Sequence, residues 1–189
     1  DALIVVGGEA GGHPAPDEVS TLVLVRAVAR AARIPVIGAG GIADGAGIAA
    51  MFALGAEGAQ LGTRFLMTEE ATVHPAYKAL VRRATISDTR LVGRGGLPVR
   101  QIRNRFTDAV DAAERAGMPR PELEALWASR SLKLAAHDGD VEQGKVEAGQ
   151  VAGLIDDILP AGELIRRLVA EADAVRQRLL GIGADAVAA

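Results

Sequence analysis

Short apolar runs alternate with longer segments of helical periodicity along the first third of the chain. Residues 2–8, 34–41 and 57–65 are apolar runs that lead into glycines, which is typical of strands buried on both faces. Between them, residues 20–33 and 43–56 carry apolar side chains every three or four positions, which predicts two helices. The alternation strand–helix–strand–helix–strand predicts an α/β fold with a parallel sheet.

Each of these two helices is expected to bury one face against the sheet. In the first helix, Leu22 and Val25 lie on the apolar face, and in the second helix Met51 and Phe52 do. Gly55 follows the second apolar segment and is expected to end that helix, because glycine readily adopts the left-handed conformation that terminates helices.

The pattern changes after residue 66. Residues 74–84 predict a short helix with His74 as its cap and Pro75 at its first position, and residues 87–96 predict a minor strand and a turn. From Pro98 onward the sequence predicts helices only, over residues 98–116, 121–136, 144–155 and 160–180.

Only three strands of a parallel sheet are evident. A (β/α)8 barrel needs eight strands and about 250 residues, so three strands cannot close one. The sequence therefore leaves two interpretations open, a small open α/β sheet or the C-terminal part of something longer. In both, the carboxyl ends of the strands form the functional edge.

Composition narrows the classes of function. The net charge of −3 gives no electrostatic reason to expect a nucleic-acid partner. The sequence contains no stretch of about 18 uncharged apolar residues, so no membrane span is expected. The absence of cysteine excludes disulfides and thiolate metal sites. The first residues lack the positive charge of a signal peptide, so the cytoplasm is the expected location.

Two glycine-bearing loops carry the strongest chemical signal. Gly40 and Gly41 follow the second strand, and Gly62 and Thr63 follow the third. Glycines there let backbone N–H groups approach a ligand, and the N-terminus of a following helix favours an anion. Two such loops on adjacent strands predict a phosphate site, to which the Thr63 hydroxyl adds a hydrogen bond. Alternatively, the glycines only make tight turns. No dinucleotide fingerprint is present.

His13 follows the first strand on the same predicted edge. Histidine readily exchanges a proton near neutral pH, so His13 is a candidate general base; the alternative is a structural role. Glu9 is a candidate to orient His13 or to bind backbone. A metal site made by His13, Glu9 and Asp17 matches no known spacing, and no metal is expected.

Four segments, in register, resemble the nitronate monooxygenase family, formerly called 2-nitropropane dioxygenases. They are "GGEAGGH", "IPVIGAGGIADG", "LGAEGAQLGTRF" and "HPAYK", and "VEAGQVAGLI" is a weaker match further along. Close relatives include the flavin-dependent type II enoyl-ACP reductases. The resemblance implies an FMN-binding (β/α)8 TIM barrel followed by a helical C-terminal region. It assigns the three strands as barrel strands six to eight, residues 1–84 to the barrel and residues 85–189 to the helical region. A truncated chain is then expected.

The resemblance also implies roles for individual residues. His13 matches the histidine at the open face of the flavin, proposed as the base that removes a substrate C–H proton. Val6 stands where nitronate monooxygenases have a glutamine, which leaves the substrate within the family open. The residues implied in cofactor binding are Gly11, Gly40, Gly41, Gln60, Leu61, Gly62 and Thr63.

The leading functional interpretation is FMN-dependent oxidation of an alkyl nitronate by oxygen. The alternative is an NAD(P)H-dependent flavin reductase acting on an enoyl thioester or a quinone. Two further interpretations are an inactive fragment that associates with another chain and a phosphate-binding barrel without flavin. A small-molecule substrate is expected in the enzyme interpretations, and a homo-oligomer is compatible with all of them.

Overall fold

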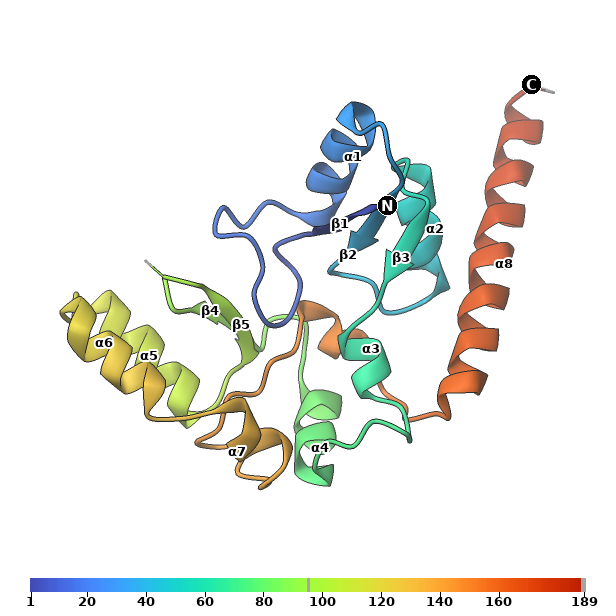
Figure 1. Cartoon of the computed structure of the whole chain (residues 1–189). Coiled ribbons are helices and arrows are strands. Elements are labelled where there is room, and N and C mark those ends of the chain that lie inside the picture. Colours follow the sequence, from blue (N-terminus) through green and yellow to red (C-terminus); the bar gives the residue numbers. More distant parts are fainter. Residues whose placement is uncertain (95, 188–189) are drawn as a thin grey trace.

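The computed structural model describes residues 1–94 and 96–187. A three-stranded parallel sheet in the order β1-β2-β3 forms first, from β1 (Leu3–Val6), β2 (Val36–Ala39) and β3 (Gly58–Gln60). Helices α1 (Thr21–Ala31) and α2 (Gly45–Ala53) connect successive strands (Figure 1). The predicted α/β class and the parallel pairing are confirmed.

A first hydrophobic cluster, which includes Val25 and Met51, lies between the sheet and these two helices. Gly38 in β2 permits this packing, because a Cβ atom there would lie 2.6 Å from the Met51 sulfur. The expectation that Leu22 and Phe52 face inward is wrong, since they are 63% and 51% exposed. Each helix packs against a sheet of only three strands. The part of the helix surface that is buried is therefore narrower than the band of apolar side chains along the helix.

The chain after β3 contains short helices, one hairpin and one long helix. The elements are α3 (Thr63–Leu66), α4 (Pro75–Arg83), β4 (Thr89–Val92), β5 (Val99–Ile102), α5 (Arg105–Arg115), α6 (Arg120–Ala128), α7 (Leu132–Ala136), the 3-10 helix η1 (Gln150–Leu154) and α8 (Ala161–Val187). As predicted, His74 caps α4: its Nδ1 accepts a hydrogen bond from the Ala76 N–H at 3.1 Å.

The prediction of helices alone after Pro98 is wrong. Residues 99–102 form β5, which pairs antiparallel with β4 and is buried along its whole length, so tertiary packing overrides helical periodicity there. The predicted helix 121–136 is interrupted, because Ser131 Oγ accepts a hydrogen bond from the Leu134 N–H at 3.2 Å and starts α7. Of the predicted helix 144–155, only η1 is helical.

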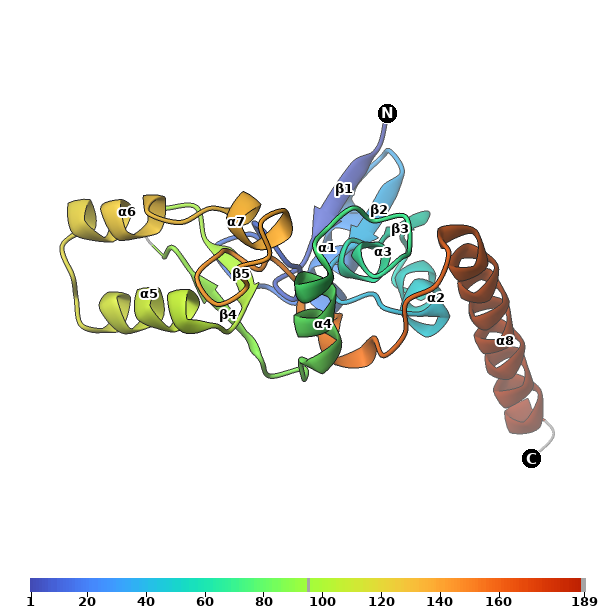
Figure 2. The ribbon, with the colours of Figure 1, turned by 90° about the horizontal axis from the view of Figure 1, so that it is seen from below.

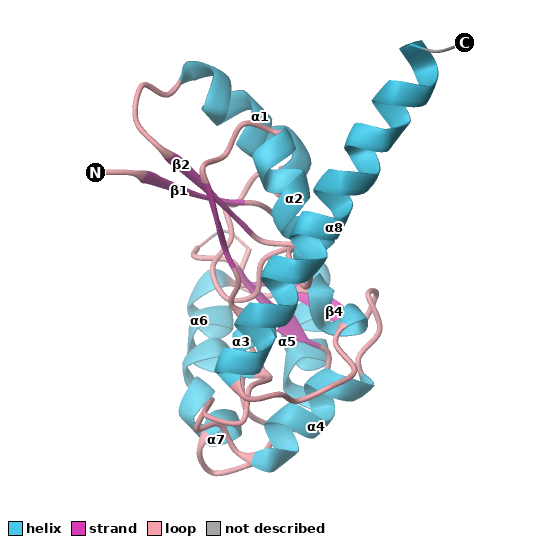
Figure 3. Cartoon of the chain, turned by 90° about the vertical axis from the view of Figure 1, so that its right-hand side faces the viewer, coloured by secondary structure: helices cyan, strands magenta, loops and turns pink. Residues whose placement is uncertain are grey.

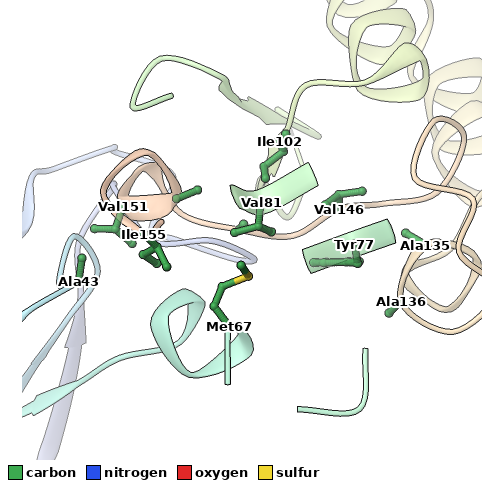
Figure 4. Packing of buried hydrophobic residues seen from close by; sticks show 12 residues of the cluster. Ala43, Met67, Tyr77, Val81, Ile102, Ala135, Ala136, Val146, Val151 and Ile155 are labelled. Atoms are coloured by element: carbon green, nitrogen blue, oxygen red, sulfur yellow. The ribbon is translucent and has the colours of Figure 1, made fainter. Parts of the chain in front are cut away.

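A second hydrophobic cluster joins the later elements to the loops of the sheet. Met67, Tyr77, Val81, Ile102 and Val146 are all almost fully buried. Figure 4 shows these side chains on α4, β5 and the segments beside them. This cluster holds the β4–β5 hairpin and the segment before η1 close to the carboxyl edge of the sheet.

Helix α8 runs beside α2 and extends past the rest of the molecule (Figures 1 and 3), whereas α5 and α6 lie on the opposite side of the sheet (Figure 2). The buried Arg64 Nη2 contacts Asp157 Oδ1 at 2.6 Å just before α8 begins. Glu171 Oε2 accepts a hydrogen bond from the Gly45 N–H at 2.9 Å, which ties α8 to the start of α2. Within residues 1–94 and 96–187, no helix has the length and apolar character needed to cross a bilayer.

Candidate functional site

A cavity of about 330 Å³ opens at the carboxyl edge of the parallel sheet, where the loops after β1, β2 and β3 meet. Parallel strands present their carboxyl ends at one edge, which is where ligands bind in open α/β sheets. Six of the predicted cofactor-binding residues line this cavity: Gly11, Gly40, Gly41, Gln60, Gly62 and Thr63. The structure therefore brings together residues from three separate loops, as the sequence predicts.

The loop after β2 exposes backbone donors to this cavity. Gly40 and Gly41 have φ values of +91° and +70°, a conformation that residues with a Cβ rarely adopt. Their N–H groups have no hydrogen-bond partner among the described residues. Two consecutive N–H groups in such a glycine turn are free to bind an anion in the cavity.

The loop after β3 adds further donors. The N–H groups of Gly62 and Thr63 also lack a partner within the described part of the chain. A Cβ atom at Gly62 would have no atom within 4 Å, so the backbone there borders open space in the cavity. Thr63 Oγ1 accepts a hydrogen bond from the Gly149 N–H at 3.0 Å, which leaves the hydroxyl hydrogen for a ligand.

The helix N-terminus after β2 is not free to bind an anion, which corrects one expectation from the sequence. Asp44 Oδ1 accepts a hydrogen bond from the Gly47 N–H at 2.9 Å, and Glu171 binds the Gly45 N–H. Two carboxylates of the chain thus neutralise the start of α2. The anion-binding capacity of this edge lies in the N–H groups of the glycine turn after β2 and in those of Gly62 and Thr63, where α3 begins.

Glu9 binds backbone and does not orient His13. Its Oε2 accepts hydrogen bonds from the Thr21 N–H at 2.9 Å and from the Thr21 hydroxyl at 2.8 Å. This carboxylate caps α1, while Ser20, at the N-cap position, makes no side-chain cap bond. Glu9 therefore fixes the loop after β1 against the first turn of α1.

His13 lies on the same loop but outside the first cavity. Its side chain is exposed and lines a neighbouring cavity between the β4–β5 hairpin, α5 and α6. Gly12, the preceding residue, lines the first cavity. The two cavities thus lie on either side of the peptide bond between Gly12 and His13.

Arg100 holds this loop in place. Gly12 and Arg100 form an antiparallel bridge, with N–H to oxygen distances of 3.1 and 2.7 Å. The Arg100 guanidinium is almost fully buried and donates through Nε to the Gly8 carbonyl at 2.8 Å and through Nη1 to Thr89 Oγ1 at 3.1 Å. Burial lowers the pKa of Arg100, and Glu18 beside it opposes that shift.

Glu147 lines the glycine-lined cavity, although the sequence did not predict it as a site residue. A Cβ atom at Gly12 would lie 3.4 Å from Glu147 Oε2, so the carboxylate borders the loop that carries His13. Its carbonyl oxygen accepts the Tyr77 hydroxyl at 2.8 Å, and burial raises the pKa of that tyrosine well above its usual range. The available signal was the "VEAGQ" segment, which begins just before Glu147.

Three further positions of the predicted site, Leu61, Val6 and Gly11, have different surroundings from one another. Leu61 packs its side chain against the first hydrophobic cluster and is not among the residues that line the cavity. Val6 does line the cavity, so the residue that departs from the family pattern lies within the candidate site. Gly11 also lines it, but a Cβ there would lie 2.5 Å from the Gly149 nitrogen, so close backbone packing alone requires this glycine.

Comparison with known proteins places these features in a family context. A family model described as "Nitronate monooxygenase" matches residues 1–171. A nitronate monooxygenase of Paraburkholderia phytofirmans is 40% identical over 90% of this chain and 49% of its own length. A (3aS,4S,5R,7aS)-5-hydroxy-7a-methyl-1-oxo-octahydro-1H-indene-4-carboxyl-CoA dehydrogenase of Mycobacterium tuberculosis is 34% identical over 91% of this chain and 59% of its own.

Solved structures give the same result at the level of the fold. FabK from Thermotoga maritima superimposes with a TM-score of 0.88 at 43% identity, over 96% of this chain and 57% of that one. A nitroalkane oxidase from Streptomyces ansochromogenes gives a TM-score of 0.78 at 35% identity, over 95% of this chain and 53% of that one. The chain thus spans about half to three-fifths of the length of the proteins it resembles.

Proposed function

The chain belongs to the nitronate monooxygenase family, and from this premise we propose that it forms the phosphate-binding side and carries the base of an FMN-dependent oxidoreductase. The proposal rests on the N–H groups of Gly40, Gly41, Gly62 and Thr63, which lie around one cavity and have no hydrogen-bond partner within residues 1–94 and 96–187. Backbone donors in glycine loops at adjacent strand ends are the usual device for a phosphate group.

The residues present fit FMN. The glycine turn at Gly40 and Gly41 and the open backbone at Gly62 leave room for a phosphate to approach the N–H groups. Thr63 adds a hydroxyl donor, and Gln60 and Gly11 line the same cavity. When bound, FMN supplies the redox chemistry of the reaction. The chain holds the cofactor in place, because binding of the phosphate orients the rest of FMN across the cavity.

We assign His13 the role of general base. Its imidazole takes up a carbon-bound proton from a neutral nitroalkane, which gives the nitronate that is then oxidised with oxygen. The loop that carries His13 is fixed by Glu9 on one side and by Arg100 on the other. A base held on a rigid loop keeps the geometry that proton transfer needs.

In this proposal the parallel sheet corresponds to strands six to eight of a (β/α)8 barrel. Residues 1–84 are then the barrel part. Residues 85–189 are the following region, which is mostly helical but also contains the β4–β5 hairpin. The high TM-scores against proteins nearly twice as long support this assignment.

An NAD(P)H-dependent flavin reductase is the second candidate function. Two observations favour it: FabK gives the higher TM-score and identity of the two structures described, and Val6 replaces the glutamine of nitronate monooxygenases within the cavity. The similarity to a carboxyl-CoA dehydrogenase is compatible with an acyl thioester substrate.

The test compares the two electron-transfer reactions on the FMN-loaded protein. Oxygen consumption with ethyl nitronate supports the first function, and anaerobic bleaching of the flavin by NAD(P)H supports the second. His13→Asn is expected to lower the rate with neutral nitroethane by about 100-fold or more, while the rate with preformed nitronate persists. His137→Asn, in an exposed turn, is the control. Equal rates for wild type and His13→Asn on nitroethane would refute the role of His13.

A further inference from the structure

The loops after β2 and β3 lead into two helices that are both attached to α8. Gly45, at the start of α2, lies four positions after Gly41, and Arg64 of α3 directly follows Thr63. Helix α8 begins only at Ala161 and runs beside α2 (Figure 3). The relative placement of the two loops therefore depends on how α2 and α3 are held by a helix far along the chain.

Gly45 makes the first attachment, through close backbone contact with α8. A Cβ atom at Gly45 would lie 2.3 Å from the Ala172 nitrogen and 2.6 Å from the Leu168 carbonyl oxygen, so the two helix backbones touch there. The Gly45 N–H also donates a hydrogen bond to Glu171 Oε2 at 2.9 Å. The start of α2 thus has one fixed place against α8.

Arg64 makes the second attachment, through a buried ion pair. Its side chain is almost fully buried and donates through Nη2 to Asp157 Oδ1 at 2.6 Å and through Nη1 to the Asp157 carbonyl oxygen at 3.3 Å. Asp157 Oδ2 accepts a further hydrogen bond from Arg167 of α8, and Arg167 Nε donates to Glu171 Oε1 at 2.7 Å. Asp157, Arg167 and Glu171, here called the α8 network, thus connect α3 to the start of α2.

We propose that Arg167 and Glu171 are positioning residues that set the distance between the two phosphate-binding loops. The inference rests on the proposed function. Neither side chain is among those that line the glycine-lined cavity, so neither touches the phosphate. N–H donors on two loops bind one phosphate only when their separation fits it, and residues behind a site maintain such a separation. Loss of the α8 network therefore weakens phosphate binding from behind the site.

The test uses four alanine variants of α8 and two ligands. Arg167→Ala and Glu171→Ala break the α8 network, whereas Arg176→Ala and Asp173→Ala break an ion pair of 2.8 Å between two exposed side chains of the same helix. Alanine favours helix, so α8 is expected to remain folded in all four. Fluorescence titration gives the Kd of each protein for FMN and for riboflavin, which lacks the phosphate.

Both network variants are expected to lower the preference for FMN over riboflavin by about fivefold or more, the effect of weakening one hydrogen bond to a charged group. Riboflavin affinity should stay the same, which general destabilisation of the fold would not allow. Both exposed-pair variants are expected to keep the preference within about twofold.

Glu171→Ala separates position from charge. A purely electrostatic effect would strengthen FMN binding when this carboxylate is removed and weaken it when the Arg167 guanidinium is removed. Positioning predicts weaker FMN binding in both variants. A stronger preference for FMN in Glu171→Ala, or an unchanged preference in both network variants, would overturn the inference.

A second measurement, on the chain without cofactor, distinguishes this inference from the proposed function. Hydrogen–deuterium exchange is followed in residues 44–50 and 63–69, which come after the two loops. Arg167→Ala is expected to speed exchange in both segments, and Arg176→Ala in neither. Equal affinity of the wild type for FMN and riboflavin, with faster exchange in Arg167→Ala, contradicts the proposed function and leaves the placement of the loops by α8 intact. Unchanged exchange in both segments overturns the inference whatever the affinity for FMN.

Discussion

Arg100→Met tests whether one buried guanidinium holds the loop between the two cavities. The substitution keeps an unbranched side chain of similar width and removes the donors to the Gly8 carbonyl and to Thr89 Oγ1. The main-chain bridge between Gly12 and Arg100 does not depend on the side chain. The loop therefore keeps one attachment and loses the other.

Opposing effects determine how far Arg100→Met lowers the free energy of unfolding. Each hydrogen bond from a charged group contributes about 1.5–3 kcal/mol, and an unsatisfied buried carbonyl costs about 1–3 kcal/mol. Removal of the buried charge offsets part of this loss of free energy, because a guanidinium with little access to water is poorly solvated. Glu18, the ionic partner at 3.7 Å, is partly exposed and regains water. The expected net loss is about 2–3 kcal/mol.

A loss of this size lowers the Tm of a chain of 189 residues by about 4–12 °C. Differential scanning calorimetry measures it, with Arg103→Met as the matched control. Arg103 is exposed and, among the residues that the structure describes, pairs only with Asp108, at 3.0 Å, so its loss is expected to cost less than about 1 kcal/mol. If Arg100→Met and Arg103→Met melt within about 2 °C of each other, Arg100 does not hold the loop.

Three further perturbations follow from the same contacts. Gly41→Ala is expected to lower stability by about 1–2 kcal/mol in urea unfolding, because φ is +70° there; an unchanged midpoint would contradict this. Burial alone would raise the pKa of Asp157, but hydrogen bonds from Arg64 and Arg167 outweigh burial and lower it. Stability should therefore fall as the pH drops below about 4. Asp157→Asn should make this fall smaller when Tm is measured from pH 6 to 3. Burial raises the pKa of Tyr77, so the wild-type protein should lose stability above about pH 10. Tyr77→Phe should lose less stability than the wild type between pH 8 and 11. Equal losses of stability in the two proteins would refute the role of burial.

The sheet and most of the glycine-lined cavity were predictable from the sequence, because local patterns determine them. Apolar runs that end in glycine define buried parallel strands, and parallel strands bring their loops to one edge. Gly40, Gly41, Gly62 and Thr63 consequently came together as expected. The family resemblance carried by the same motifs is confirmed by the match over residues 1–171.

The parts that sequence reasoning missed depend on contacts between distant segments. β5 reads as the start of a helix, yet it pairs with β4 and with Gly12. Glu9 lies four positions before His13 in the sequence, yet its carboxylate binds Thr21. Arg100 carries no local signal, because its role exists only once the hairpin lies against the loop after β1.

The proposal that the glycine loops bind the phosphate of FMN is tested by a comparison of FMN with riboflavin. The two share the ring system and differ by the phosphate, and titration of the chain follows the fluorescence of each. Wild type is expected to bind FMN at least tenfold more tightly than riboflavin. Gly62→Val should abolish this difference without lowering Tm, since its Cβ would meet no atom within 4 Å. Equal affinity for the two ligands, or no binding of either, would contradict the claim.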